Sequence, residues 1–155
     1  MGTVLSAGAV RALIAVLGGW FEMVSGARYV FVTLVWIYLA GILVQVFLAG
    51  IGLFGAAKDF EPHVGLGWIL HLVPVLLLIA AAVGRVGRGL LWWTAALLVV
   101  QFVQPILATL RNDLPLVAAF HPVLALIIFW LAVMIGLKAL RLVREAAPTL
   151  ARPEP

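Results

Sequence analysis

The stretch that decides the fold is residues 63–84, HVGLGWILHLVPVLLLIAAAVG, which contains no Asp, Glu, Lys or Arg. A helix of this length rises about 33 Å, and the hydrocarbon core of a bilayer is about 30 Å thick. Three more runs of similar length and composition lie at 29–54, 90–110 and 116–137. The sequence therefore predicts four membrane-spanning helices.

The composition of the whole chain agrees with this reading. Of 155 residues, 66% are hydrophobic and only 10% are charged, whereas soluble domains are about half apolar and roughly a quarter charged. The chain has no cysteine, which excludes disulfides, thiolate metal sites, iron–sulfur clusters and thiol nucleophiles. Ten Lys and Arg residues are interpreted as topology signals, so we expect contact with membrane lipids and none with nucleic acid.

Short breaks rich in charge, glycine or proline separate the four spans, at 58–62, 85–89 and 111–115. Connections this short make neighbouring helices antiparallel, so the prediction is an all-α, up-down-up-down four-helix bundle in the membrane. We divide the chain into an N-terminal interfacial segment (1–26), a transmembrane domain (27–141) and a polar C-terminal tail (142–155). The sequence contains no convincing internal repeat.

The basic residues predict the orientation of the bundle. With four spans, eight of them fall on one side and two, Lys58 and Arg111, on the other. The eight are Arg11, Arg28, Arg85, Arg88, Lys138, Arg141, Arg144 and Arg152. By the positive-inside rule, both termini and the middle loop lie in the cytoplasm, and the protein is integral to a bacterial cytoplasmic membrane.

Residues 3–23 allow two interpretations. They are apolar enough for a fifth span, yet Arg11 lies near their middle and Gly18-Gly19 precedes Trp20-Phe21. We favour an amphipathic helix that lies on the cytoplasmic face of the membrane. A secretory signal peptide is not indicated, because no basic region precedes the apolar run and no small-residue cleavage pattern follows it.

Polar side chains inside a bilayer are costly, so each one in a span calls for a partner, a ligand or water. Those in the outer half of the predicted bundle come from all four spans, and they are Gln45, His63, His71, Gln101, Gln104 and His121. For the glutamines we favour hydrogen bonds that cross-link helices. The three histidines are the chain's entire histidine content, and they predict a b-type haem, which needs two imidazole ligands and no cysteine.

The residues alone leave the axial pair open between His63 with His121 and His71 with His121, since both pairs lie at compatible depths. Greater depth in the bilayer slightly favours His71, because an unpaired imidazole is more costly there. Gly67 lies between His63 and His71 at intervals of four and is expected to make room for the haem ring. The same role is expected for Ala125 and for a stripe formed by Gly41, Gln45, Ala49 and Gly52.

Several short motifs resemble those of a known family. Phe60-Glu61-Pro62-His63 precedes the second apolar run, and Ala119-Phe120-His121 opens the fourth. Val44 to Gly50 and Gln101-Phe102-Val103-Gln104 are compatible with the first and third helices of the same pattern. Over about residues 29 to 140, the chain resembles one four-helix half of a haem A synthase, and it is also similar to uncharacterised four-span bacterial membrane proteins. The resemblance implies that His63 and His121 are the axial ligands.

Two functions are compatible with these patterns. The first is a membrane b-type cytochrome that carries one electron between a quinone or membrane donor and a partner subunit, with Gln45, Gln101 or Gln104 bonding the haem propionates or the quinone. The alternative is a cofactor-free structural or assembly subunit of a larger membrane complex. In either case we expect another membrane subunit or a homodimer. No nucleophile motif accompanies the histidines, so we do not expect an enzyme.

Overall fold

The computed structural model describes residues 6–56 and 58–146, and within these residues it contains helices and no strand. The elements in chain order are α1 (Ala7–Leu53), α2 (Glu61–Val83), α3 (Arg88–Thr109), α4 (Pro115–Ala118) and α5 (Phe120–Ala146). Four helical segments are long and apolar enough to cross a membrane: α1, α2, α3 and α4 together with α5. The predicted all-α membrane helical bundle is confirmed.

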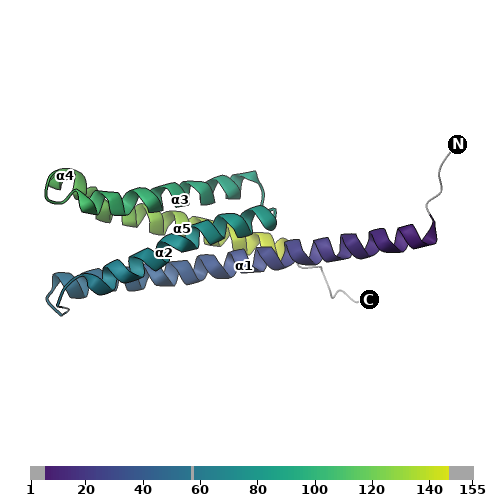
Figure 1. The fold of residues 1–155 in the computed structure, drawn as a ribbon, viewed down its shortest axis with the longest axis horizontal. Helices are drawn as coiled ribbons and strands as arrows, with labels where there is room; N and C mark the ends of the chain where they lie inside the picture. The colour runs from purple at the N-terminus through teal and green to yellow at the C-terminus, as the bar shows by residue number, and fades with distance from the viewer. Residues whose placement is uncertain (1–5, 57, 147–155) are drawn as a thin grey trace, which may run out of the picture.

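The bundle consists of two helical hairpins. Figure 1 shows α1 beside α2, and α3 beside α5, with successive spans running in opposite directions. Each helix of one hairpin also contacts a helix of the other, α2 with α3 and α1 with α5. The two hairpins lie close together at the end that holds the α2–α3 turn and diverge toward the end that holds α4 (Figure 1).

The end at which the hairpins lie close together, at the α2–α3 turn, is called the closed end, and the buried core occupies only this end. Its fully buried side chains include Phe31, Val35, Leu77, Leu97 and Ile135. Buried positions stop at Ile42 on α1 and at Gln101 on α3, and they begin only at Leu70 on α2 and Ile128 on α5. Beyond this level, every described side chain is at least partly exposed. The half of the bundle that diverges therefore lacks a packed interior.

Contacts between α1 and the α2–α3 turn stabilise the closed end. The guanidinium of Arg28 on α1 donates to the carbonyl of Gly84 (2.8 Å) and to that of Arg85 (3.5 Å). These carbonyls follow the last turn of α2, where helix geometry leaves acceptors free. A Cβ at Gly84 would lie 3.2 Å from the Arg28 backbone nitrogen, so glycine allows this close approach. Arg85 also lies over the Trp20 ring, 4.9 Å from its centre.

The fourth predicted span is broken near its start by proline. Residues Pro115–Ala118 form α4, and α5 starts at Phe120. In a continuous helix, the carbonyl of Ala118 would accept from the backbone nitrogen of residue 122, but Pro122 has no N–H to donate. The chain turns at Ala119 instead, which places His121 in the first turn of α5.

Helix α1 is longer than the predicted first span. It runs without a break for 47 residues, about 70 Å, so the interfacial segment and the first span join in one helix across the boundary at residues 26 and 27. Residues 7–23 are exposed throughout and extend past the bundle (Figure 1). Whether they lie on the membrane surface stays a prediction. Helix α5 reaches Ala146, five residues past the predicted domain boundary, and the rest of the predicted tail, 147–155, is outside the described residues.

Candidate functional site

His63 lies in the first turn of α2 and is bonded to the outer part of α1. Its Nδ1 lies 3.0 Å from the backbone oxygen of Gln45. The side-chain amide of Gln45 donates in return to the backbone oxygen of His63 (2.7 Å). Two hydrogen bonds therefore join the same two residues and fix the imidazole relative to α1.

His121 repeats this arrangement in the second hairpin. It lies in the first turn of α5, and its Nδ1 is 2.9 Å from the backbone oxygen of Gln104 on α3. The side-chain nitrogen of Gln104 lies 3.0 Å from His121 Nε2. A glutamine near the outer end of the first helix thus holds a histidine at the start of the second helix in both hairpins.

The repetition is visible in the sequence once the pairing is known. His63 follows Gln45 by 18 residues, and His121 follows Gln104 by 17. Sequence analysis identified all four residues but not which glutamine contacts which histidine. The similar spacing of glutamine and histidine in the two hairpins was the available signal for this pairing.

The two histidines face each other from opposite hairpins. Their ring centres are 6.4 Å apart and the ring planes make an angle of 67°. A backbone oxygen can only accept a hydrogen bond, so in a neutral imidazole the proton is on Nδ1 and Nε2 carries a free lone pair. For His121 the assignment is supported by the Gln104 amide, which donates to Nε2. Both rings are therefore held in the tautomer that can bind a metal through Nε2.

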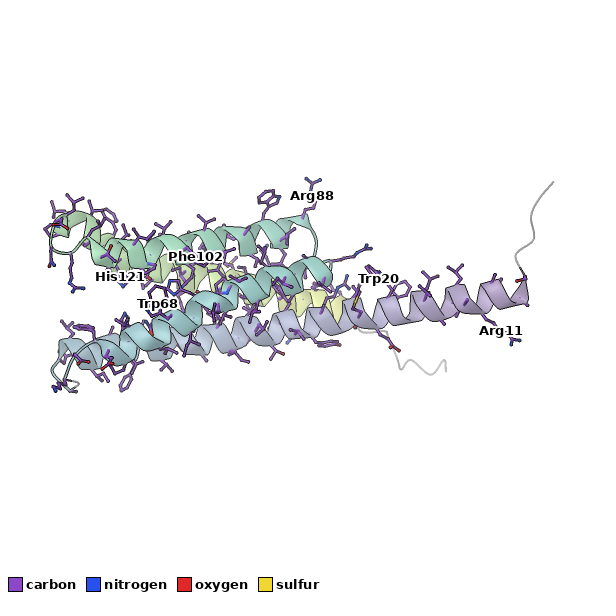
Figure 2. The ribbon with its side chains drawn as sticks, viewed as in Figure 1. Arg11, Trp20, Trp68, Arg88, Phe102 and His121 are labelled. Atoms are coloured by element: carbon purple, nitrogen blue, oxygen red, sulfur yellow. The ribbon has the colours of Figure 1, made fainter. Side chains whose placement is uncertain are left out.

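His71 lies two turns farther into the bundle and is buried, with 8% of its surface exposed. Its Nδ1 contacts the backbone oxygen of Gly67, one turn earlier on the same helix. Trp68 and Phe102 flank the ring, with centres 5.6 and 5.7 Å away, and Figure 2 shows these two aromatic side chains near His121 in the diverging half. His71 Nε2 is buried without a hydrogen-bond partner among the described residues.

A small cavity lies between the four long helices at the level where the core ends. Its volume is about 50 Å³, and its polar lining residues are Gln45, His71, Gln101 and Gln104. Gln101 is buried and accepts a hydrogen bond from the hydroxyl of Tyr38. We call this cavity the glutamine chamber. Tyr38 was missed by sequence analysis, since an aromatic residue in an apolar run gives no sign that its hydroxyl has a buried partner.

The small residues expected to accommodate a haem ring lie at close contacts between helices and side chains. A Cβ at Gly41 would lie 2.6 Å from the side chain of Leu70, and one at Gly67 would lie 3.0 Å from the Gln45 amide. Gly52 is packed in the same way against Phe60. Ala125, however, lines the glutamine chamber. As expected for the glutamines, the side chains of Gln45, Gln101 and Gln104 all make hydrogen bonds between helices.

Among the described residues, no group of three or more His, Cys, Asp or Glu side chains could hold a metal ion. The site therefore offers at most a pair of imidazoles from the protein. Glu61 is exposed near His63, but the Nδ1 of His63 is engaged by Gln45. A metal bound here would need its remaining ligands from another source.

The model of DUF6220, a family of unknown function, matches residues 45–110 of the chain. This part is less than half of the chain, and it contains Gln45, His63, His71, Gln101 and Gln104 but not His121. Neither the curated proteins nor the solved structures include a match to the chain.

Proposed function

We propose that the protein is a membrane b-type cytochrome in which His63 and His121 are the axial ligands of one haem. The observation that carries the proposal is the mutual arrangement of the two rings. They come from opposite hairpins, lie 6.4 Å apart and are each bonded through Nδ1 to a glutamine carbonyl. The bonds at Nδ1 leave Nε2 as the nitrogen of each ring that could bind iron.

Haem fits the donor set better than a free metal ion does. Structural zinc sites take about four protein ligands and catalytic ones about three, whereas the described residues provide no such group. The macrocycle supplies four nitrogens itself, so haem iron requires only one or two ligands from the protein. Two imidazoles without cysteine or carboxylate are sufficient for a b-type haem.

The separation of the rings supports the same choice. An imidazole nitrogen binds a metal at about 2 Å and lies about 1 Å from the centre of its ring, so two rings on opposite faces of one iron have centres about 6 Å apart. The observed 6.4 Å agrees with this value. A haem would have to enter the diverging half of the bundle, where no described side chain is buried.

When bound, haem supplies a one-electron redox couple at its iron. The carbonyls of Gln45 and Gln104 accept hydrogen bonds from the Nδ1 protons of the two ligands, which fixes the orientation of the rings. The Gln104 side chain must release His121 Nε2 before that nitrogen can bind iron. With His63 and His121 as its two protein ligands, the haem would supply electron transfer and not oxygen chemistry. A quinone or a partner subunit would provide or accept the electron.

The proposal is tested by a dithionite-reduced minus oxidised spectrum of the purified protein, with a pyridine haemochrome to count haem per chain. The protein should come from haem-replete cells and be purified without chelator. We expect about one haem per chain in the wild type, and its loss in His63→Ala and in His121→Ala. His71→Ala is the matched variant and should keep the haem. A colourless wild type would contradict the proposal, and loss of haem in His71→Ala with retention in His63→Ala would assign a different axial pair.

A second function, a cofactor-free structural or assembly subunit, is favoured by the N-terminal part of α1. Ile14 and Phe21 expose 64% and 70% of their surface there, and no described element packs against residues 7–23 except at Trp20. An apolar helix of this kind requires lipid or another protein as its environment. Purification without pigment, together with a stably bound second membrane protein, would favour this function over the cytochrome.

A further inference from the structure

The glutamine chamber is a polar feature that the haem proposal does not use. It lies at the level of His71, at the inner limit of the diverging half. Gln45 and Gln104, which hold His63 and His121, also line it. Whatever binds in the chamber therefore contacts the same glutamines that orient the proposed ligands.

Two hydrogen-bond acceptors on the chamber's lining residues are buried without a donor among the described residues, namely Gln45 Oε1 and His71 Nε2. The orientation of the Gln45 amide follows from its bond to the backbone oxygen of His63. That oxygen can only accept a hydrogen bond, so the amide nitrogen must be the donor, and Oε1 is the amide atom without a partner. The His71 tautomer follows from its contact with the Gly67 carbonyl. The carbonyl accepts a hydrogen bond from Nδ1, so the proton of the neutral ring is on Nδ1 and Nε2 is an acceptor. Both free atoms consequently need a donor.

Two buried acceptors without a donor are expensive in a bilayer, because each unsatisfied polar group costs several kcal/mol in hydrocarbon and roughly 1–3 kcal/mol by mutational estimates in proteins. His71 is more than nine-tenths buried, with 8% of its surface exposed. The chamber beside it is the place from which a donor can reach both side chains.

The size and charge of the chamber identify the class of donor. Pockets that bury organic ligands measure about 300–1,000 Å³, and the chamber measures about 50 Å³. It is thus too small for a quinone ring or for part of a macrocycle. A water molecule occupies about 30 Å³ in the liquid. No Asp or Glu side chain lines the chamber, so a metal cation would have no counter-charge there.

We infer that the glutamine chamber is a binding site for one or two water molecules, which donate hydrogen bonds to His71 Nε2 and Gln45 Oε1. The amide nitrogen of Gln101 is a matching donor to the water oxygen, since the carbonyl of that amide is engaged by Tyr38. A buried water makes about three hydrogen bonds, and these three groups provide them. The bound water supports the Gln45 amide and, through it, the position of His63.

The site is tested by water-edited NMR on protein labelled with ¹⁵N-histidine and ¹³C-leucine in lipid nanodiscs. The sample is reduced with dithionite, so that a bis-histidine haem, if present, is diamagnetic. Single substitutions of the three histidines assign their signals. We expect rapid magnetisation transfer from water to the His71 ring, and only background transfer to the side chain of Leu97, which is 0% exposed in the apolar core.

Ala125→Leu fills the chamber and should reduce transfer to His71 to the level of Leu97. The matched control is Ala96→Leu, at an exposed position of α3 outside the chamber, which should leave the transfer unchanged. If Ala125→Leu does not fold by circular dichroism, the smaller Ala125→Val serves the same purpose. A wild-type His71 without water transfer would overturn the inference, and so would unchanged transfer in a folded filled variant. The measurement does not depend on haem, so its failure is distinguishable from failure of the cytochrome proposal.

Discussion

Replacing Tyr38 by phenylalanine removes one hydroxyl from the centre of the bundle and leaves the ring contacts in place. Tyr38 is 0% exposed and Gln101 6% exposed, and the Tyr38 hydroxyl donates to Gln101 Oε1. Without that donor the buried amide oxygen loses its partner, which costs about 1–3 kcal/mol in proteins generally. Measured couplings between membrane helices average about 0.6 kcal/mol with a maximum of about 1.7. We therefore expect Tyr38→Phe to lower the free energy of unfolding by about 1–2 kcal/mol.

The assay is reversible unfolding by SDS in mixed micelles, followed by the fluorescence of the six tryptophans. Gln101→Leu should destabilise by a similar amount, because it leaves the Tyr38 hydroxyl unpaired. The double variant removes both polar groups and should recover most of the loss, which gives a coupling energy of about 1 kcal/mol or more. Thr94→Val is the control, since Thr94 is equally buried but bonds only to Leu90 of its own helix. If the double variant loses the sum of the two single effects, the hydrogen bond does not stabilise the bundle.

Two further predictions concern the glutamines that hold the histidines. A Cβ at Gly67 would meet the Gln45 amide at 3.0 Å, whereas Gly65 has open space around it. In the same unfolding assay, Gly67→Ala should destabilise the protein by about 1–3 kcal/mol, and Gly65→Ala should be neutral or stabilising by up to about 1 kcal/mol. Equal effects of the two substitutions would contradict the packing of Gln45 against Gly67. The Gln104 side chain occupies His121 Nε2, so Gln104→Leu should increase haem affinity about 2- to 10-fold, as expected for loss of a competing bond of about 0.5–1.5 kcal/mol. Spectral titration of apoprotein with haem measures this, and weaker binding would show that Gln104 supports bound haem instead.

The spans were predictable from the sequence because the bilayer imposes a length on any apolar segment without charge. The prediction of 63–84 corresponds to α2 at Glu61–Val83, and that of 90–110 to α3 at Arg88–Thr109. The break at Ala119 was not predicted, because residues 116–137 were interpreted as one continuous span and proline alone does not decide a break: Pro74 and Pro105 lie inside continuous helices. The continuity of α1 was not predicted either. Gly18, Gly19 and Gly26 lower helix propensity by only about 1 kcal/mol each, and a glycine in a helix interior does not by itself end the helix.

The candidate residues were predictable by type, but their partners depend on how the helices are rotated against one another. Gly41 and Gly67 mark where α1 and α2 approach, yet small residues serve equally well to admit a ligand or a neighbouring side chain. The structure places Leu70 and the Gln45 amide in these positions. Sequence alone cannot separate the two uses, because both require the same absence of a Cβ.

The depth argument that favoured His71 illustrates a second limit. It assumed that a deep imidazole without a ligand leaves both of its nitrogens unpaired. In the structure the Gly67 carbonyl engages His71 Nδ1 within its own helix, so only Nε2 needs a partner, and a water molecule is enough to provide one. For His63 and His121, the two hairpins bring the rings into an edge-on contact where the core has ended, with their centres 6.4 Å apart. A shared haem is the proposal that makes use of this contact.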